Sequence, residues 1–247
     1  MPWRNTRVPY RILVSEVMLQ QTGVERVMTK YAEFIRAFPG FRALAQAGVA
    51  EVLAAWKGLG YNRRALALRE AARIVVETYH GRMPRTVETL IELPGIGRAT
   101  ASAVLVYSFN LALPFIETNV RRVFIHFFFP RSRQVTDAML MPLVEGALDR
   151  DNPREWYYAL MDYGAMLGKT AVNANTRSAR YRKQARFEGS IRQLRGKILA
   201  AILERGPVTE AQIARESGEV DERLSRALTQ LVAEGFLRRQ GRRYSFR

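Results

Sequence analysis

Glu16 is a carboxyl group in surroundings that suit proton transfer. It lies inside the apolar run of residues 12–19, which reads ILVSEVML. A carboxyl group among apolar side chains is costly to ionise, so its pKa should rise and it can keep a proton near neutral pH. That property suits a general acid. A surface glutamate paired with Arg4 or Arg11 would give the same local pattern and stays open as an alternative at this point.

A second carboxylate, Glu117, stands with Asn119 at the expected start of a helix, in the string FIETNVRRVF of residues 115–124. Side chains of this kind cap helix N-termini, and capping alone would account for both residues. The more specific interpretation is a carboxylate that stabilises positive charge on a sugar. Two carboxyl groups in unequal environments are the usual equipment for breaking a glycosidic bond.

The loop LPGIG of residues 93–97 lies between two predicted helices and carries Gly95 and Gly97. Glycine tolerates positive φ angles and lets another backbone approach closely. The amides that follow point outward at a helix start, where a phosphate is favoured. We therefore expect a helix-hairpin-helix that grips a DNA backbone without reading its sequence. An ordinary tight turn is the alternative, and a nucleotide-binding P-loop is excluded because no GK[ST] follows.

The composition indicates a protein that meets a polyanion. Among 247 residues, 39 lysines and arginines outnumber 23 acidic residues, which gives a net charge of +16. Nucleic acid is the favoured partner, and an anionic membrane surface is the alternative. We expect no membrane association, because no apolar run could span a bilayer and no basic amphipathic helix has an aromatic face. The polar first residues, MPWRNTR, lack the apolar core of a signal peptide.

The absence of cysteine limits the chemistry. With no cysteine and only two histidines, the chain can form no disulfide and no cysteine-ligated iron–sulfur cluster. A histidine-built zinc site is not expected either. We expect no metal and no cofactor, with a monovalent ion at the LPGIG hairpin as an open alternative. Catalysis would depend on carboxylates, hydroxyls, lysines or backbone groups.

Helices must position the candidate catalytic and DNA-binding groups, because apolar residues recur along the chain mostly at intervals of three and four. The periodicity predicts helices over residues 10–21, 25–38, 49–60, 63–81, 86–93, 97–109, 117–129, 136–149 and 153–167. The fold class is therefore mainly α, with a first domain over residues 1–167. Residues 192–247 are predicted to form three helices and a two-stranded wing that turns at Gln240 and Gly241. That order resembles a small winged helix-turn-helix.

Residues 168–191 are predicted to be a polar, basic connector between these domains. Around it lie the basic residues Arg177, Arg180, Arg182, Lys183, Arg186, Arg192, Arg195 and Lys197, with Glu188 as the one acidic residue among them. They could contact phosphates directly or form a solvated face. The last residues carry Arg238, Arg239, Arg242, Arg243 and Arg247. This charge favours DNA over a protein as the ligand of the winged helix.

Several strings together resemble the helix-hairpin-helix DNA glycosylase superfamily, and most of all its A/G-specific adenine glycosylase (MutY-like) branch. They are PWR (2–4), PYRILVSEVMLQQT (9–22), LAAWKGLGYNRRA (53–65), ELPGIGRATASAV (92–104), TNVRRV (118–123) and ALMDYGAML (159–167). The resemblance covers residues 2–167 and implies a two-lobed helical domain. Such enzymes flip a base out of the duplex and cut its bond to the sugar.

The resemblance implies catalytic roles for three residues. Glu16 matches the glutamate that protonates the purine ring and makes the base a better leaving group. Glu117 stands where the family usually has aspartate, facing the oxocarbenium-like sugar, and Asn119 matches an asparagine that supports this site. Arg4 matches a pocket arginine. Tyr158 falls in the base pocket, where adenine enzymes usually carry glutamine or glutamate.

The resemblance also implies the DNA contacts. Gln21 and Thr22 match residues that enter the double helix near the orphan base, and Tyr61 matches a tyrosine that enters the minor groove. The hairpin residues Gly95, Gly97 and Arg98 would hold a phosphate. The implied partner is double-stranded DNA with a mismatch or lesion, bound by a monomer. The implied location is the cytoplasm, at the nucleoid of a bacterial-type cell.

Three departures from the family refine these expectations. Bifunctional relatives carry a lysine at the position of Ala99, whose amine forms a Schiff base with the sugar, so alanine predicts a monofunctional enzyme in which water attacks. Gly168 stands where the cysteines of the cluster region should begin, so other packing must replace the iron–sulfur cluster. A winged helix takes the place of the usual C-terminal domain that checks for 8-oxoguanine.

The sequence thus predicts a monofunctional DNA glycosylase of base excision repair, a hydrolase acting on N-glycosyl bonds. The default substrate is adenine opposite G or 8-oxoguanine. Tyr158 keeps open a thymine or uracil glycosylase acting at G mispairs, or one that removes another damaged base. The alternative outside enzymes is a non-catalytic protein that binds DNA lesions. The presence of Glu16 together with Glu117 and Asn119 argues against a non-catalytic protein. Glutamate in place of the family's aspartate at position 117 argues for one.

Overall fold

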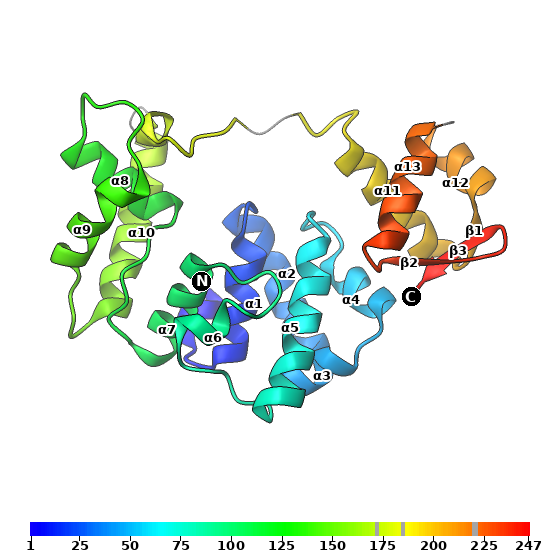
Figure 1. The fold of residues 1–247 in the computed structure, drawn as a ribbon, viewed down its shortest axis with the longest axis horizontal. Coiled ribbons are helices and arrows are strands. Elements are labelled where there is room, and N and C mark those ends of the chain that lie inside the picture. The colour runs from blue at the N-terminus through cyan, green and yellow to red at the C-terminus, as the bar shows by residue number, and fades with distance from the viewer. Residues whose placement is uncertain (171–172, 184–185, 219–221) are drawn as a thin grey trace. The chain divides into compact units, whose positions relative to one another are not determined.

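Helices make up most of the chain, as the computed structural model in Figure 1 shows. The structure describes residues 1–170, 173–183, 186–218 and 222–247. The chain divides into two units. Unit 1 comprises Met1–Val17 and Met83–Lys183, and unit 2 comprises Met18–Arg82 and Gln184–Arg247. None of the described helices is long and apolar enough to cross a membrane.

Unit 1 contains both carboxylates singled out by the sequence. Its elements are η1 (Pro2–Asn5), most of α1 (Pro9–Leu19), α6 (Val87–Leu90), α7 (Arg98–Phe109), α8 (Thr118–Phe128), α9 (Asp137–Ala147), α10 (Pro153–Thr170) and η2 (Ala174–Arg177). Helix α7 is buried over residues 101–108 and therefore belongs to the core of this unit. Helices α9 and α10 pack against α8, and η2 covers another part of α8 (Figure 1).

A buried tyrosine fixes the segment that leads into α8. The hydroxyl of Tyr157 on α10 accepts a hydrogen bond from the amide of Phe115 at 2.8 Å and lies 3.2 Å from the carbonyl oxygens of Leu113 and Phe115. The rings of Phe115 and Tyr157 stack with their centroids 3.9 Å apart. Because a buried hydroxyl must be satisfied, this contact sets where the extended chain turns into α8, and so where Glu117 lies.

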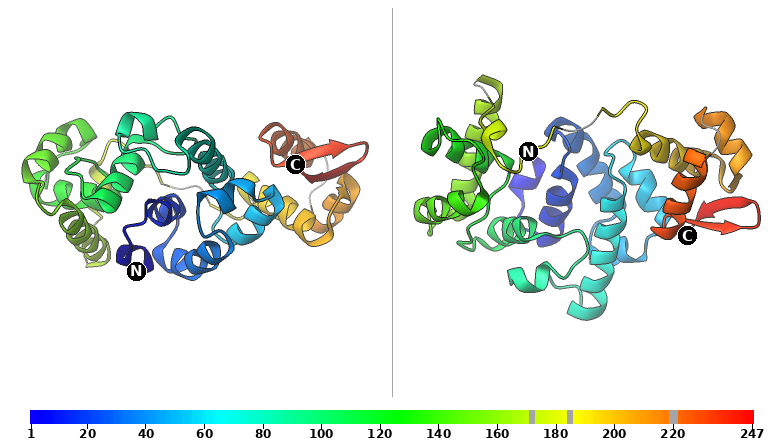
Figure 2. Two further views of the ribbon diagram at one scale, coloured as in Figure 1. Left: turned by 90° about the horizontal axis from the view of Figure 1, so that it is seen from below. Right: turned by 45° about the horizontal axis from the view of Figure 1, so that its top comes forward.

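Unit 2 contains a helical part and the C-terminal module. The helical part comprises α2 (Val24–Ala37), α3 (Phe41–Gln46), α4 (Val49–Trp56) and α5 (Arg63–Tyr79). The C-terminal module comprises α11 (Ile191–Arg205), β1 (Val208–Thr209), α12 (Glu210–Ser217), α13 (Glu222–Ala233), β2 (Leu237–Gln240) and β3 (Arg243–Phe246). Its antiparallel sheet has the order β1-β3-β2, with Leu237 opposite Phe246. Figure 2 shows the β2–β3 hairpin beside the helices of this module.

The predicted helices are present, but several of their ends differ, and four short elements were not predicted. They are α3, β1 and the 3-10 helices η1 and η2, each of two to six residues, which carry too little periodicity to be recognised. The helix predicted over 49–60 ends at Trp56, since Gly58 and Gly60 take φ angles of +96° and +71°. The helix predicted to end at residue 167 continues to Thr170. Residues 168–170 of the predicted connector are therefore helical.

Candidate active site

Glu16 lies on α1 of unit 1 and is half-buried between neighbours that are fully buried. Burial raises the pKa of its carboxyl group to about 8, and the negative charge of Glu117 adds to the shift. An arginine partner would have lowered this pKa. Arg4, one of the two partners considered, instead forms a bidentate ion pair with Asp162, with both N–O distances at 2.7 Å. A carboxyl group with this pKa is mostly protonated at neutral pH.

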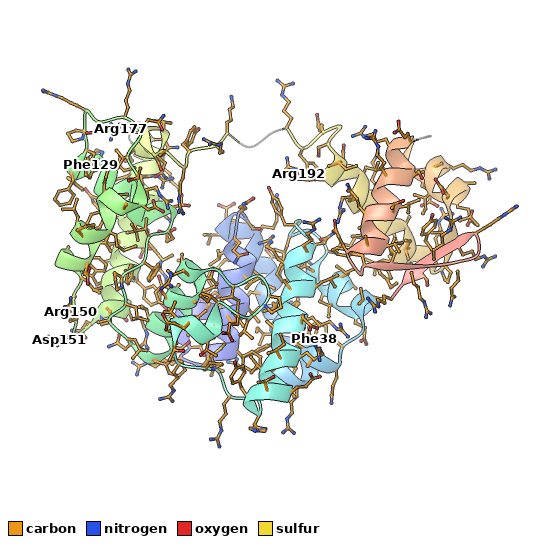
Figure 3. All side chains as sticks on the ribbon, viewed as in Figure 1. Phe38, Phe129, Arg150, Asp151, Arg177 and Arg192 are labelled. Carbon is orange, nitrogen blue, oxygen red and sulfur yellow. The ribbon has the colours of Figure 1, made fainter. Side chains whose placement is uncertain are left out.

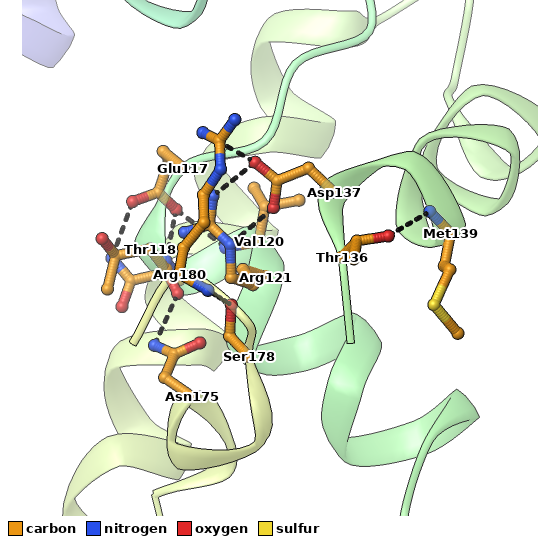
Figure 4. Close-up of polar contacts among 11 residues, drawn as sticks. Glu117, Thr118, Val120, Arg121, Thr136, Asp137, Met139, Asn175, Ser178 and Arg180 are labelled. Carbon is orange, nitrogen blue, oxygen red and sulfur yellow. Dashed lines mark hydrogen bonds and ion pairs between the residues drawn. The ribbon is translucent and has the colours of Figure 1, made fainter. Parts of the chain in front are cut away.

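Glu117 is the N-cap of α8, as the capping interpretation predicts. Its Oε1 atom accepts hydrogen bonds from the amides of Asn119 at 2.7 Å and Val120 at 2.8 Å (Figure 4). Burial raises the pKa of this carboxyl group, while the two amides and the charges of Arg121 and Arg122 act in the opposite direction. The same side chain faces Glu16 closely enough to raise the pKa of Glu16. The two interpretations of Glu117 are therefore compatible.

Two stacked tyrosines line the space near these carboxylates. The rings of Tyr107 on α7 and Tyr158 on α10 lie 4.8 Å apart at 8° to each other. The Tyr107 hydroxyl donates to the sulfur of Met161 at 3.0 Å. Burial and the charges of Glu16 and Glu117 raise the pKa of Tyr107, and burial together with Glu16 raises that of Tyr158 to about 12. Both hydroxyls are therefore neutral donors beside the carboxyl pair.

Arg4 and Tyr158, the predicted pocket residues, lie together. The guanidinium carbon of Arg4 is 4.5 Å from the centroid of the Tyr158 ring, a cation–π distance. Asp162, one turn further along α10, holds that guanidinium by the ion pair described above. Sequence reasoning missed Tyr107 and Asp162. The sequence could have pointed to Tyr107, because it is a polar aromatic residue in a helix, residues 98–109, that otherwise consists mainly of apolar and small residues.

Asn119 is held by residues that sequence reasoning also missed. The Nη1 atom of Arg122 donates to Asn119 Oδ1 at 2.8 Å and to the carbonyl oxygen of Gly164 at 2.5 Å. A Cβ atom at Gly164 would lie 2.6 Å from the carbonyl oxygen of Asn119. Only glycine therefore lets α10 approach the first turn of α8 this closely. At Gly168, a Cβ atom would lie 2.7 Å from Arg122 Nη1.

Polar contacts hold the segment around η2, near where the resemblance would place the start of an iron–sulfur region. Asn175 Nδ2 on η2 donates to the carbonyl oxygen of Thr118 at 3.0 Å, and Asp137 binds Arg121 at 2.8 Å and Arg180 at 3.0 Å (Figure 4). Arg177, labelled in Figure 3, donates to the Pro130 carbonyl oxygen at 3.0 Å. The chain has no cysteine, and its described residues include no group of three or more potential metal ligands. These residues do not fit an iron–sulfur cluster.

The LPGIG loop precedes α7 in unit 1. Gly95 has a φ angle of +76°, as expected for a tight turn, whereas Gly97 has a φ angle of −86°. Of the two glycines that could take a positive φ, only Gly95 does so. Gly97 is the N-cap of α7, and no side chain caps this end. Arg98 is exposed on the first turn and lies 3.9 Å from Glu88. The first amides of α7 can thus face an anion.

Gln21, Thr22 and Tyr61 belong to unit 2, whereas the catalytic and pocket candidates belong to unit 1. Gln21 follows the end of α1 with a φ angle of +56°, and Tyr61 precedes α5 with a φ angle of +46°. Neither is a glycine, so both occupy the left-handed region at some cost. Gln21 is exposed and Tyr61 is half-buried. The predicted site residues thus form one group around Glu16, a second group on two strained loops of unit 2, and a third at the hairpin before α7.

Comparison with known proteins places the chain in a family. Residues 14–145 match the model of the HhH-GPD superfamily base excision DNA repair protein. An adenine DNA glycosylase of Mycolicibacterium smegmatis is 35% identical over 96% of this chain and 87% of its own length. A thermostable thymine-DNA glycosylase structure has a TM-score of 0.62 and 31% identity, covering 67% of this chain and 78% of that one.

A second solved structure, a non-covalent endonuclease III–DNA complex, shares the fold at a TM-score of 0.55 and 18% identity, over 65% of this chain and 73% of that one. The family match covers more than half of the chain, and the mycobacterial relative is similar along nearly all of it. This chain belongs to the HhH-GPD superfamily of base excision DNA repair proteins.

Proposed function

We propose that this chain is a monofunctional adenine DNA glycosylase, which hydrolyses the bond between a flipped adenine and its deoxyribose. The observation that carries the proposal is the pairing of Glu16, whose pKa is raised to about 8, with the second carboxylate Glu117. Similarity to an adenine DNA glycosylase over 96% of this chain supports adenine as the base. The charge of +16 suits a DNA duplex as the partner.

In the proposed reaction, Glu16 donates its proton to a ring nitrogen of the adenine, because a carboxyl group with a pKa near 8 is mostly protonated at neutral pH. The bond from the base to C1′ then breaks, and its electron pair leaves with the base. Glu117 stabilises the positive charge that develops on the sugar. Water adds to C1′ and gives its proton to the Glu16 carboxylate, which restores the acid.

The other groups of unit 1 hold this arrangement. Asn119 is fixed by Arg122 and lies next to Glu117, whose oxygen accepts the Asn119 amide. Tyr158 and Arg4 would form a wall of the base pocket, in which the Tyr158 ring is held between Tyr107 and the Arg4 guanidinium. Ala99 is exposed on the first turn of α7 and carries no amine. No Schiff base can form there, so the strand is left uncut.

A thymine or uracil glycosylase acting opposite G is the second candidate. It is favoured by Tyr158, which is buried against Tyr107 and has no amide to pair with adenine. The similarity to a thymine-DNA glycosylase structure at 31% identity supports it. The two candidates share the carboxylate pair and differ in the base that the tyrosine wall accepts.

Single-turnover excision on a panel of duplexes separates these candidates. The panel contains A opposite 8-oxoguanine, A opposite G, T and U opposite G, and hypoxanthine, each assayed with and without alkali. We expect strand breaks at the A-containing pairs, and only after alkali, because a monofunctional enzyme leaves an intact abasic strand. Cleavage at T or U would assign the second candidate. Breaks without alkali would contradict the monofunctional mechanism.

The C-terminal module is proposed to bind the DNA backbone. The residues Arg238, Arg239, Arg242 and Arg243 of its wing are all exposed. Each phosphate contact made by such a residue releases counterions, so the affinity should fall steeply with salt. The module would thus add sequence-independent affinity to a domain that recognises the lesion.

The wing proposal predicts a change in salt dependence. In an Arg242→Gln, Arg243→Gln double variant, the slope of log K against log salt concentration should become shallower by about 0.9 for each lost phosphate contact. Arg73→Gln is the matched control, because Glu70 and Glu77 already pair with Arg73. Fluorescence anisotropy with an undamaged duplex measures both slopes. An unchanged slope in the double variant would remove the wing from the DNA interface.

A further inference from the structure

Two loops of unit 2 carry residues in the left-handed backbone region, and both loops end on candidate DNA-contacting residues. One loop follows α1 and contains Gln21 with a φ angle of +56°, and the other precedes α5 and contains Tyr61 with a φ angle of +46°. Non-glycine residues hold such angles only when the surrounding structure imposes them. The residue that imposes them should contact both loops.

Arg64, at the start of α5, makes these contacts. Its Nη1 atom donates to the carbonyl oxygens of Met18 at 2.9 Å and Gln20 at 2.5 Å. Its Nη2 atom donates to Thr22 Oγ1 at 2.9 Å, to the Gly60 carbonyl oxygen at 3.0 Å and to the Leu59 carbonyl oxygen at 3.2 Å. One guanidinium group therefore joins the backbone before Gln21 and the Thr22 side chain after it to the backbone just before Tyr61.

Aromatic rings and a hydroxyl complete the junction. The guanidinium carbon of Arg64 is 5.4 Å from the ring centroid of Trp56 and 5.5 Å from that of Tyr61. Thr22 Oγ1 lies 3.4 Å from the Leu59 carbonyl oxygen, which adds a direct link between the loops. Arg64 is half-buried, and burial lowers its pKa to about 10, so the group stays charged at neutral pH. Charged donors make the stronger hydrogen bonds to carbonyl oxygens.

We propose that Arg64 is a positioning residue for DNA insertion, which holds the Gln21–Thr22 loop and the Tyr61 loop at a fixed separation so that both enter the duplex together. The inference rests on the proposed function and on the DNA contacts that the family resemblance implies for Gln21, Thr22 and Tyr61. Opening a base pair requires side chains to replace stacking and pairing at once, and two independently moving loops would lose much of that effect. The planar fork of arginine is needed because lysine offers donors from a single nitrogen atom.

The competing role for Arg64 is fold stability alone, and α5 offers a matched control. Arg69 lies on the same helix, is half-buried, and donates from Nε to the Ala47 carbonyl oxygen at 2.6 Å. This hydrogen bond reaches neither the Gln21–Thr22 loop nor the Tyr61 loop. Arg69→Gln therefore removes a comparable arginine–carbonyl bond without releasing Gln21 or Tyr61.

The test compares Arg64→Gln, Arg64→Lys and Arg69→Gln at a temperature where circular dichroism shows all of them folded. Single-turnover excision is measured for adenine opposite G and for adenine opposite an abasic site, where no partner base must be displaced. We expect Arg64→Gln to lose about 30-fold on the paired duplex and less than about threefold opposite the abasic site. Arg64→Lys should lie between it and the parent, and Arg69→Gln should match the parent on both.

Base extrusion is followed separately with 2-aminopurine at the target position, in proteins that also carry Glu16→Gln so that no base is removed. The parent should raise the fluorescence as the base unstacks, and Arg64→Gln should abolish most of that rise. Equal losses on the two duplexes, or a fluorescence rise that Arg64→Gln and Arg64→Lys leave intact, would overturn the inference. If the Glu16→Gln protein raises the fluorescence but the protein with Glu16 intact excises no base, the proposed function would be contradicted instead.

Discussion

Glu16→Gln is expected to lower the single-turnover rate of adenine excision by about 10³-fold while leaving duplex affinity nearly unchanged. Glutamine has almost the shape of the protonated acid and can donate a hydrogen bond, but it cannot transfer a proton to the leaving base. The site would therefore keep its packing around α1 and lose its chemistry. Gel-quantified excision and fluorescence anisotropy on the same duplex measure the two effects.

The pH profile checks the same assignment in the parent protein. Because the pKa of Glu16 is raised to about 8, the acid stays protonated at neutral pH. The rate should fall about tenfold per pH unit above pH 8. The free energy of unfolding should also decrease as the pH rises from 4.5, the ordinary pKa of a glutamate, to 8, because ionising the buried carboxyl group of Glu16 is costly. Glu16→Gln should remove that dependence. A variant that excises adenine as fast as the parent would show that Glu16 is not the acid.

Glu117→Gln is expected to lower the excision rate by about 10²-fold, because the charge that stabilises the sugar cation is lost. Both capping hydrogen bonds end on one oxygen, Oε1, and an amide oxygen can accept them equally. The first turn of α8 should therefore stay intact, and the melting temperature should change little. The loss of rate would then be due to the missing negative charge of Glu117 and not to the loss of the helix cap.

A second signature distinguishes this role from simple packing. The charge of Glu117 contributes to the raised pKa of Glu16, so Glu117→Gln should move the upper inflection of the pH–rate profile to lower pH. Glu117→Asp is the control that keeps the charge, and it should recover most of the rate. If the neutral variant keeps the parent rate and inflection, Glu117 is a helix cap with no part in the chemistry.

The sequence alone determined the parts of this protein that depend on neighbours along the chain. Helical periodicity identified nearly all the helices, because each buries one face at intervals of three and four residues. Glu16 and Glu117 stood out because each local environment, an apolar run and a helix start, is visible in a few consecutive residues. The lack of cysteine excluded a thiolate-bound cluster without any knowledge of the fold. The tight turn at Gly95 followed from its loop in the same way.

The tertiary structure decided which of these residues meet. Tyr107 and Tyr158 stack although 51 positions in the sequence separate them. Arg122 donates to the carbonyl oxygen of Gly164, which lies 42 positions further along the chain. Arg64 joins two loops through the carbonyl oxygens of Gln20 and Gly60, and a backbone carbonyl leaves no signal in the type of residue that supplies it. The pKa of Glu16 depends likewise on a charge that arrives from a distant helix. Such contacts arise from how helices pack, and a pattern within one helix specifies only which face is buried.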